Sequence, residues 1–159
     1  MIKTNSLHKI NSEIEFGFSA DEYSMFKYGD INIAKKYGEK LAISFIKENT
    51  STLLDSNQIV VLSSPYCFIP TATFSLTKYF VYELNKWLML NSKNVVQESK
   101  IHRTITYKED YGGLSAEQRI KLIGNDSFHI DKKFMEEKLL LFIDDVKITG
   151  SHELVIKNM

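Results

Sequence analysis

Hydrophobic residues recur at helical spacing in two long segments of the chain. In residues 30–49, with Asn49 at the expected end, and in residues 70–90, apolar positions are mostly three or four residues apart, which places them on one helical face. A capping-box pattern at residues 19–22 predicts a shorter helix that ends near Gly29. The residues expected to be buried are Ala34, Tyr37, Leu41, Phe45 and Ile46 in the first long helix and Leu76, Phe80, Leu84, Trp87 and Leu88 in the second.

Short runs of apolar and β-branched residues separate these helices and predict strands. Residues 59–62 and 139–143 are unbroken apolar runs, typical of strands that are covered on both faces of a parallel sheet. Residues 95–107 favour an extended conformation, with an interruption expected at 97–100. Residues 128–130 predict a short edge segment.

The alternation of helices and strands predicts the fold class. We expect residues 1–159 to form a single domain, an α/β three-layer Rossmann-like domain with a mainly parallel sheet. A further capping box at Ser115 predicts one more helix, which ends near Gly124. The last strand lies close to the C-terminus, so the fold is expected to be shortened on its C-terminal side or completed there in another way.

Composition excludes several classes of partner and site. The formal net charge is zero, which gives no argument for binding nucleic acid or an acidic membrane surface. The single cysteine, Cys67, excludes an internal disulfide, and the four histidines have no zinc-type spacing. No apolar run has the length of a signal-peptide core or a membrane span. We therefore expect a soluble, cytoplasmic protein.

The most informative polar residues follow the strand at 139–143. Asp144 and Asp145 stand where that strand ends, and ligands of parallel sheets bind beyond the carboxyl ends of the strands. Because successive strand side chains point to opposite sides, one acid is expected to face a ligand while the other braces the loop. The turn Thr149-Gly150-Ser151 precedes an expected helix, so its N–H groups and hydroxyls suit a phosphate. The loop at 63–67, after the other apolar strand, is a second candidate site.

Residues 144–152, Asp-Asp-Val-Lys-Ile-Thr-Gly-Ser-His, resemble the phosphoribosyl-pyrophosphate motif of type I phosphoribosyltransferases. In that motif four hydrophobic residues precede two acids and a Thr-Gly turn. The Ser-Ser-Pro-Tyr run at 63–66 and the Tyr-Lys-Glu-Asp-Tyr-Gly loop at 107–112 extend the similarity to the bacterial ComF-like subgroup.

The resemblance implies a role for each segment. Asp144 and Asp145 hold the ribose hydroxyls of phosphoribosyl pyrophosphate (PRPP) and help to place Mg²⁺, through those hydroxyls or through water. Residues 103–113 form a loop that closes over pyrophosphate, with Arg103, Lys108, Tyr107 and Tyr111 as donors. Catalytic roles fall to Asp144, Asp145, Arg103 and Lys108. The remaining PRPP-binding residues are Ser63, Ser64 and Tyr66 at the pyrophosphate end and Lys147, Thr149, Gly150, Ser151 and His152 around the 5′-phosphate.

Three positions depart from the common family pattern. His152 replaces a threonine, Lys147 replaces an apolar residue, and Ile148 stands where the 6-oxopurine enzymes carry an acid. The last difference disfavours hypoxanthine and guanine as acceptors. Other purines, orotate-like acids and unusual bases remain open.

The sequence thus leads to one main functional hypothesis and two alternatives. The main hypothesis is transfer of a 5-phosphoribosyl group from PRPP to a nitrogenous base or base-like acceptor, with release of pyrophosphate and with Mg²⁺ as cofactor. The first alternative is a non-catalytic sensor of PRPP. The second is a phosphatase or receiver-like protein that uses Asp144 as the phosphoryl acceptor. Expected partners are small molecules and a second copy of the chain in a homodimer, with neither nucleic acid nor membrane.

Overall fold

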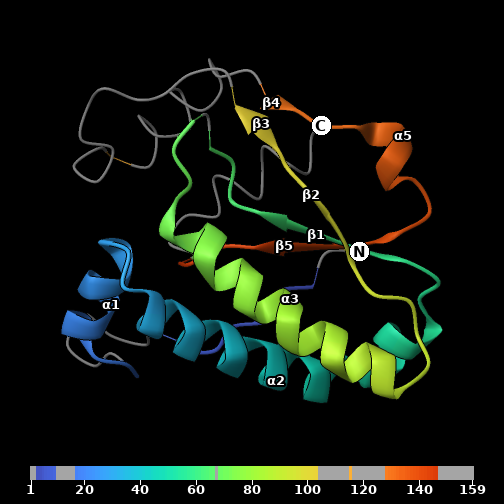
Figure 1. The fold of residues 1–159 in the computed structure, drawn as a ribbon, viewed down its shortest axis with the longest axis horizontal. Helices are drawn as coiled ribbons and strands as arrows, with labels where there is room; N and C mark the ends of the chain where they lie inside the picture. The colour runs from blue at the N-terminus through green and yellow to red at the C-terminus, as the bar shows by residue number, and fades with distance from the viewer. Residues whose placement is uncertain (1–2, 10–16, 67, 104–114, 116–127, 147–159) are drawn as a thin grey trace.

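A computed structural model of the protein describes residues 3–9, 17–66, 68–103, 115 and 128–146 (Figure 1). The predicted helix at Ser115 and the predicted turn at 149–151 lie outside the described elements. In chain order, the elements are α1 (Ala20–Lys27), α2 (Ile31–Asp55), β1 (Ile59–Ser63), α3 (Ala72–Leu90), β2 (Gln97–Ser99), β3 (His102–Arg103), β4 (Phe128–His129), α5 (Lys132–Met135) and β5 (Leu139–Ile143).

A parallel sheet with strand order β2-β1-β5 forms the centre of the domain. Its central strand, β1, pairs in parallel with β2 from Val60 opposite Gln97 and with β5 from Ile59 opposite Leu139. A separate antiparallel pair, β3 with β4, places His102 opposite His129. The carboxyl ends of β1 and β5 therefore lie side by side, as the candidate site requires.

Helices cover the sheet in layers, which confirms the predicted three-layer α/β class. Figure 1 shows α2 and α3 side by side on one side of the sheet and α5 on the other. Side chains of α2, α3 and alternate residues of β1 and β5 form the larger core. Val60 and Leu62 point the other way and pack with Ile101 and Met135. None of the described helices is long and apolar enough to cross a membrane.

The α2 and α3 helices approach each other closely at Gly38. A Cβ atom at this position would lie 2.5 Å from the carbonyl oxygen of Leu76 and 2.8 Å from the Cβ of Tyr79. Only glycine fits this crossing without movement of the α3 backbone. The close approach fixes α3 against α2 and thereby positions the helical layer beneath β1.

Asn49 interrupts the first long helix at the predicted position, but a second helical stretch follows directly and extends the element beyond it. Its backbone leaves helical geometry (φ −127°, ψ 20°), but the chain resumes as helix to Asp55. The Asn49 side chain donates a hydrogen bond to the carbonyl oxygen of Phe45 at 2.8 Å and accepts one from Lys3 at 2.8 Å. These bonds give the Asn49 side chain and the Phe45 carbonyl hydrogen-bond partners at the interruption. In the helical turn that follows, Leu53 is completely buried.

Two strand predictions also need correction. Residues 97–99 do not interrupt the extended segment but form β2, because an edge strand tolerates exposed polar side chains. In β5 the expected cover on both faces is incomplete, since Leu140 is 45% exposed. Among the strands that the structure describes, only β1, which has neighbours on both sides, is buried along its whole length.

Candidate functional site

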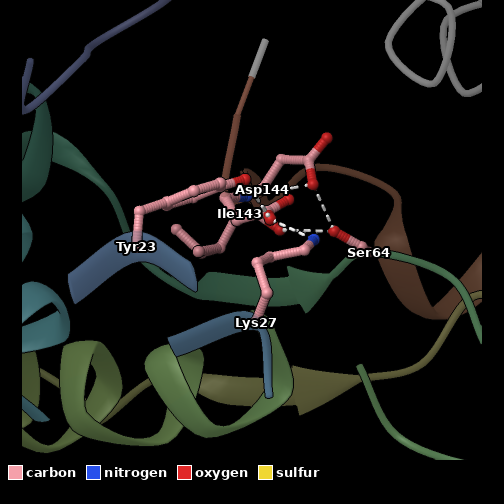
Figure 2. Close-up of polar contacts among 6 residues, drawn as sticks. Tyr23, Lys27, Ser64, Ile143 and Asp144 are labelled. Atoms are coloured by element: carbon pink, nitrogen blue, oxygen red, sulfur yellow. Dashed lines mark hydrogen bonds and ion pairs between the residues drawn. The ribbon is translucent and has the colours of Figure 1, made fainter. Parts of the chain in front are cut away.

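The ends of β1 and β5 bring Ser64 and Asp144 together. Because Ser63 pairs with Ile143 in the parallel register, the next residue of each strand continues to the same edge of the sheet. The Ser64 hydroxyl donates to Asp144 Oδ1 at 2.5 Å, and the backbone N–H of Asp145 donates to the same oxygen at 3.0 Å (Figure 2). The Asp144 carboxylate is thus oriented by two donors while its side chain remains partly accessible to solvent.

The neighbouring acid, Asp145, has different partners. The ammonium of Lys27 lies 2.5 Å from Asp145 Oδ2, and the Tyr23 hydroxyl donates to that oxygen at 2.9 Å. Both donors come from α1, more than a hundred residues earlier in the chain, and the Asp145 side chain is only 9% exposed. Figure 2 shows Tyr23 and Lys27 reaching the strand end from the α1 side.

Sequence reasoning missed Tyr23 and Lys27. Their spacing of four places them on the same face of α1, which is a recognisable signal that they act together. The sequence does not say which distant acid they meet, because that depends on how α1 docks on the sheet.

Docking of α1 involves apolar and ionic contacts. Phe26 is buried in the core and meets the Tyr37 ring edge-on, with ring centroids 5.7 Å apart. On the exposed side, the Lys36 ammonium lies 2.7 Å and 2.8 Å from the two carboxylate oxygens of Glu22. The hydroxyl of Ser19 accepts the N–H of Glu22, which confirms the predicted start of the helix.

Ser63 and Tyr66 line a hollow of about 200 Å³ beside α3, and neither Ser64 nor Asp144 is among the residues that line it. The Tyr66 ring meets the Phe74 ring edge-on at 5.8 Å, and the Lys100 ammonium lies 3.9 Å from the centre of the Tyr66 ring. At the rim, Lys78 forms an ion pair with Glu98 at 2.7 Å. The Ser-Ser-Pro-Tyr loop is therefore divided between two surfaces.

The predicted pyrophosphate loop begins at the β3–β4 pair. The backbone of Arg103 pairs with that of Phe128, so the two ends of the intervening segment are held together. Tyr66 forms an isolated parallel bridge with His102, which places the start of this segment beside the loop that follows β1.

The structure places six of the predicted site residues and leaves the others outside the described part of the chain. Ser64, Asp144 and Asp145 meet at the strand ends, Ser63 and Tyr66 line the hollow, and Arg103 is placed through its backbone. The predicted residues that are not among the described ones are Tyr107, Lys108, Tyr111, Lys147, Thr149, Gly150, Ser151 and His152.

The described residues contain no group of three or more acidic, histidine or cysteine ligands around a common point. Mg²⁺ commonly binds through one or two carboxylates together with substrate phosphates and water. Asp144 is oriented by Ser64 and is partly accessible, so it suits a site that the ligand completes. It does not suit a metal site made of protein ligands alone. The donor set is therefore compatible with Mg²⁺ that arrives with a phosphorylated ligand.

Burial and the nearby Asp145 carboxylate raise the pKa of Tyr23 above its ordinary value. Burial contributes most, because the phenolate is poorly solvated in this position. The Tyr23 hydroxyl therefore stays protonated at neutral pH and can donate to Asp145.

Stability is expected to fall more steeply with pH in the wild type than in Tyr23→Phe once the pH passes about 10. Unfolded Tyr23 loses its proton near the ordinary value of 10.0, whereas the folded protein holds it to higher pH. The unfolded state then binds fewer protons than the folded state, so the free energy of unfolding decreases as the pH rises. Below the ordinary pKa of tyrosine, the stabilisation that comes from protonated Tyr23 is fully present. Urea midpoints from about pH 7 to about pH 11 measure the difference, and parallel curves for the two proteins would contradict it.

The class of protein follows from the fold and the site together. A parallel α/β domain with a serine and an acid at the carboxyl ends of adjacent strands has its candidate ligand site where such sheets bind phosphorylated ligands. The model of the family described as PRTase ComF-like matches residues 1–159, so the chain belongs to the ComF-like phosphoribosyltransferase family, a family of the transferase class. Searches of curated proteins and of solved structures found no match.

Proposed function

We propose that this protein transfers a 5-phosphoribosyl group from PRPP to a nitrogenous base or base-like acceptor and releases pyrophosphate. The observation that carries the proposal is the Ser64–Asp144 contact at the carboxyl ends of β1 and β5, within a chain whose full length matches the family. The contact joins two segments to which the resemblance gives different parts of PRPP. The Ser-Ser-Pro-Tyr run is expected at the pyrophosphate end, and the segment that begins at Asp144 is expected at the ribose and the 5′-phosphate.

The proposed division of roles follows from the charges that develop during transfer. Displacement of pyrophosphate builds positive charge on the ribose ring and negative charge on the leaving group. Asp144, fixed by two hydrogen bonds, supplies a preoriented carboxylate for the ribose side. Donors of the segment that starts at β3, Arg103 and Lys108, are proposed to act on the pyrophosphate side.

Mg²⁺ is proposed as the cofactor, and its chemistry is to neutralise the charge of the pyrophosphate group. Asp144 is the described residue best placed to orient the metal through the ribose hydroxyls or through water. The acceptor is proposed to be a base without the 6-oxopurine requirement for an acid at position 148, which is isoleucine here.

Transfer is tested by incubating the protein with PRPP, Mg²⁺ and each member of a panel of purine, pyrimidine and orotate-like acceptors. The expected result is release of pyrophosphate with one acceptor class, together with a product whose mass equals that of the acceptor plus a phosphoribosyl group. Reactions without acceptor, and reactions with excess chelator, serve as controls for hydrolysis and for the metal.

Two other results would change the proposal. Saturable PRPP binding without turnover on any acceptor would favour the alternative of a non-catalytic sensor. Absence of both binding and turnover would contradict the phosphoribosyl function itself.

A further inference from the structure

The two adjacent acids at the end of β5 are held by different parts of the fold. We propose that Asp145 is a positioning residue that fastens α1 to the end of β5, and that Asp144 is the acid of the pair that faces the phosphoribosyl donor. The second half of this inference rests on the function proposed above.

The contacts of Asp145 are those of an anchor. Its side chain is nearly buried, and one carboxylate oxygen receives both the Lys27 ammonium and the Tyr23 hydroxyl. An ion pair reinforced by a second hydrogen bond in a partly buried place is stronger than an exposed pair of the same charges. The Asp145 carboxylate is therefore committed to α1.

Releasing this carboxylate to a ligand would have a cost on the α1 side. Tyr23 is half-buried and sits between the rings of Phe18 and Phe26, with centroid distances of 5.6 Å and 6.1 Å. Phe26 is buried in the core, and its ring contact with Tyr23 favours the position in which the Tyr23 hydroxyl meets Asp145. A half-buried hydroxyl that loses its hydrogen-bond acceptor destabilises the folded protein.

A backbone contact links the anchor to the neighbouring acid. The N–H of Asp145 donates to Asp144 Oδ1 at 3.0 Å, the same oxygen that accepts the Ser64 hydroxyl. Fixing the Asp145 side chain against α1 fixes its backbone, and the backbone in turn holds the Asp144 carboxylate. In this way Tyr23 and Lys27 position Asp144 without contacting the donor.

The test compares Asp145→Asn with the double variant Tyr23→Phe/Lys27→Met, which keeps Asp145 but removes both of its α1 donors. PRPP binding in the presence of Mg²⁺ is measured by calorimetry, and docking of α1 is measured by hydrogen exchange of a peptide that covers residues 18–29. Lys27→Arg, which retains the positive charge, is the conservative control. Asp144→Asn is the reference for loss of a ligand contact.

The inference predicts that Asp145→Asn and the double variant each speed exchange in α1 and weaken PRPP binding to the same extent, by about tenfold or less. Combining all three substitutions should weaken binding no further, because they remove one and the same anchor. Lys27→Arg alone should leave both measurements close to wild type, because it keeps the positive charge beside Asp145.

Three results would overturn the inference. Binding that is at least about tenfold weaker in Asp145→Asn than in the double variant would mean that Asp145 contacts the donor itself. Unchanged α1 exchange in both variants would mean that Asp145 is not an anchor. Asp144→Asn binding as well as Asp145→Asn would remove the assigned difference between the acids. If wild type fails to bind PRPP, the proposed function fails, whereas the exchange measurement still decides the anchor.

Discussion

Replacing Asp144 with asparagine is expected to weaken binding of PRPP with Mg²⁺ by about 100-fold or more. The substitution keeps the shape of the side chain and an oxygen that can accept the Ser64 hydroxyl and the Asp145 N–H. It removes the negative charge that is proposed to orient the ribose hydroxyls and the metal. Calorimetric titration of both proteins at the same Mg²⁺ concentration measures the loss.

The matched control for Asp144→Asn is Asp55→Asn. Asp55 lies exposed at the end of α2, so its variant has the same change of net charge without altering the strand ends. The control is expected to bind as wild type does. A dissociation constant for Asp144→Asn within about threefold of wild type would exclude the assigned role, provided that urea unfolding shows the variant to be folded.

Phe80→Ala is expected to cost about 3–5 kcal/mol of unfolding free energy. Phe80 is 1% exposed, packs in the core formed by α2, α3 and the sheet, and lies with its ring centroid 5.7 Å from that of Phe45. Truncation leaves a cavity beneath β1 that the closely crossed helices cannot easily fill. Because domains of this size are stable by only about 5–15 kcal/mol, the variant should unfold at much lower urea concentration.

Phe74→Ala provides the comparison within the same helix. Phe74 is partly exposed and lines the hollow beside Tyr66, so its truncation should destabilise the protein clearly less than that of Phe80. Equal losses of unfolding free energy in Phe74→Ala and Phe80→Ala would mean that the core is not centred on Phe80, where the structure places it. Any PRPP-induced stabilisation should persist in Phe80→Ala at temperatures where it remains folded, since the strand ends are unaltered.

Much of the fold could be predicted because its signals are local. The helical spacing of Leu76, Phe80, Leu84, Trp87 and Leu88 predicts the buried face of α3, and all are buried except Trp87, which is partly buried. Likewise, the apolar run of β1 predicts a strand covered on both faces, and β1 is buried along its whole length. Local pattern is informative here because a central strand covered on both faces is apolar along its whole length, and a helix beneath a sheet has one continuous apolar face.

The errors occur where distant partners decide the structure. Local preference indicates the break at Asn49, but the Asn49 side chain also accepts a hydrogen bond from Lys3, 46 positions away, and a second helical stretch follows and buries Leu53. Leu140 belongs to an apolar run but lies on a strand that has one described neighbour in the sheet. No pattern within a few residues contains this information.

The candidate site shows the same division. Asp144 and Asp145 could be identified from their position after an apolar strand, and Ser64 from its place after another. Their separate partners could not, because the contacts of Tyr23 and Lys27 with Asp145 join residues 122 and 118 positions apart. Such contacts depend on the docking of α1, which is determined by Phe26 and the core.

The central claim is that the ends of β1 and β5 form a PRPP site, and calorimetric titration of the wild-type chain tests it most directly. PRPP is titrated with Mg²⁺, with excess chelator, and against ribose 5-phosphate and inorganic pyrophosphate as separate ligands. The expected result is saturable binding of one PRPP per chain that requires Mg²⁺ and is tighter than the binding of either fragment. Absence of saturable PRPP binding, or binding that is unchanged by removal of Mg²⁺ and matched by pyrophosphate alone, would contradict it.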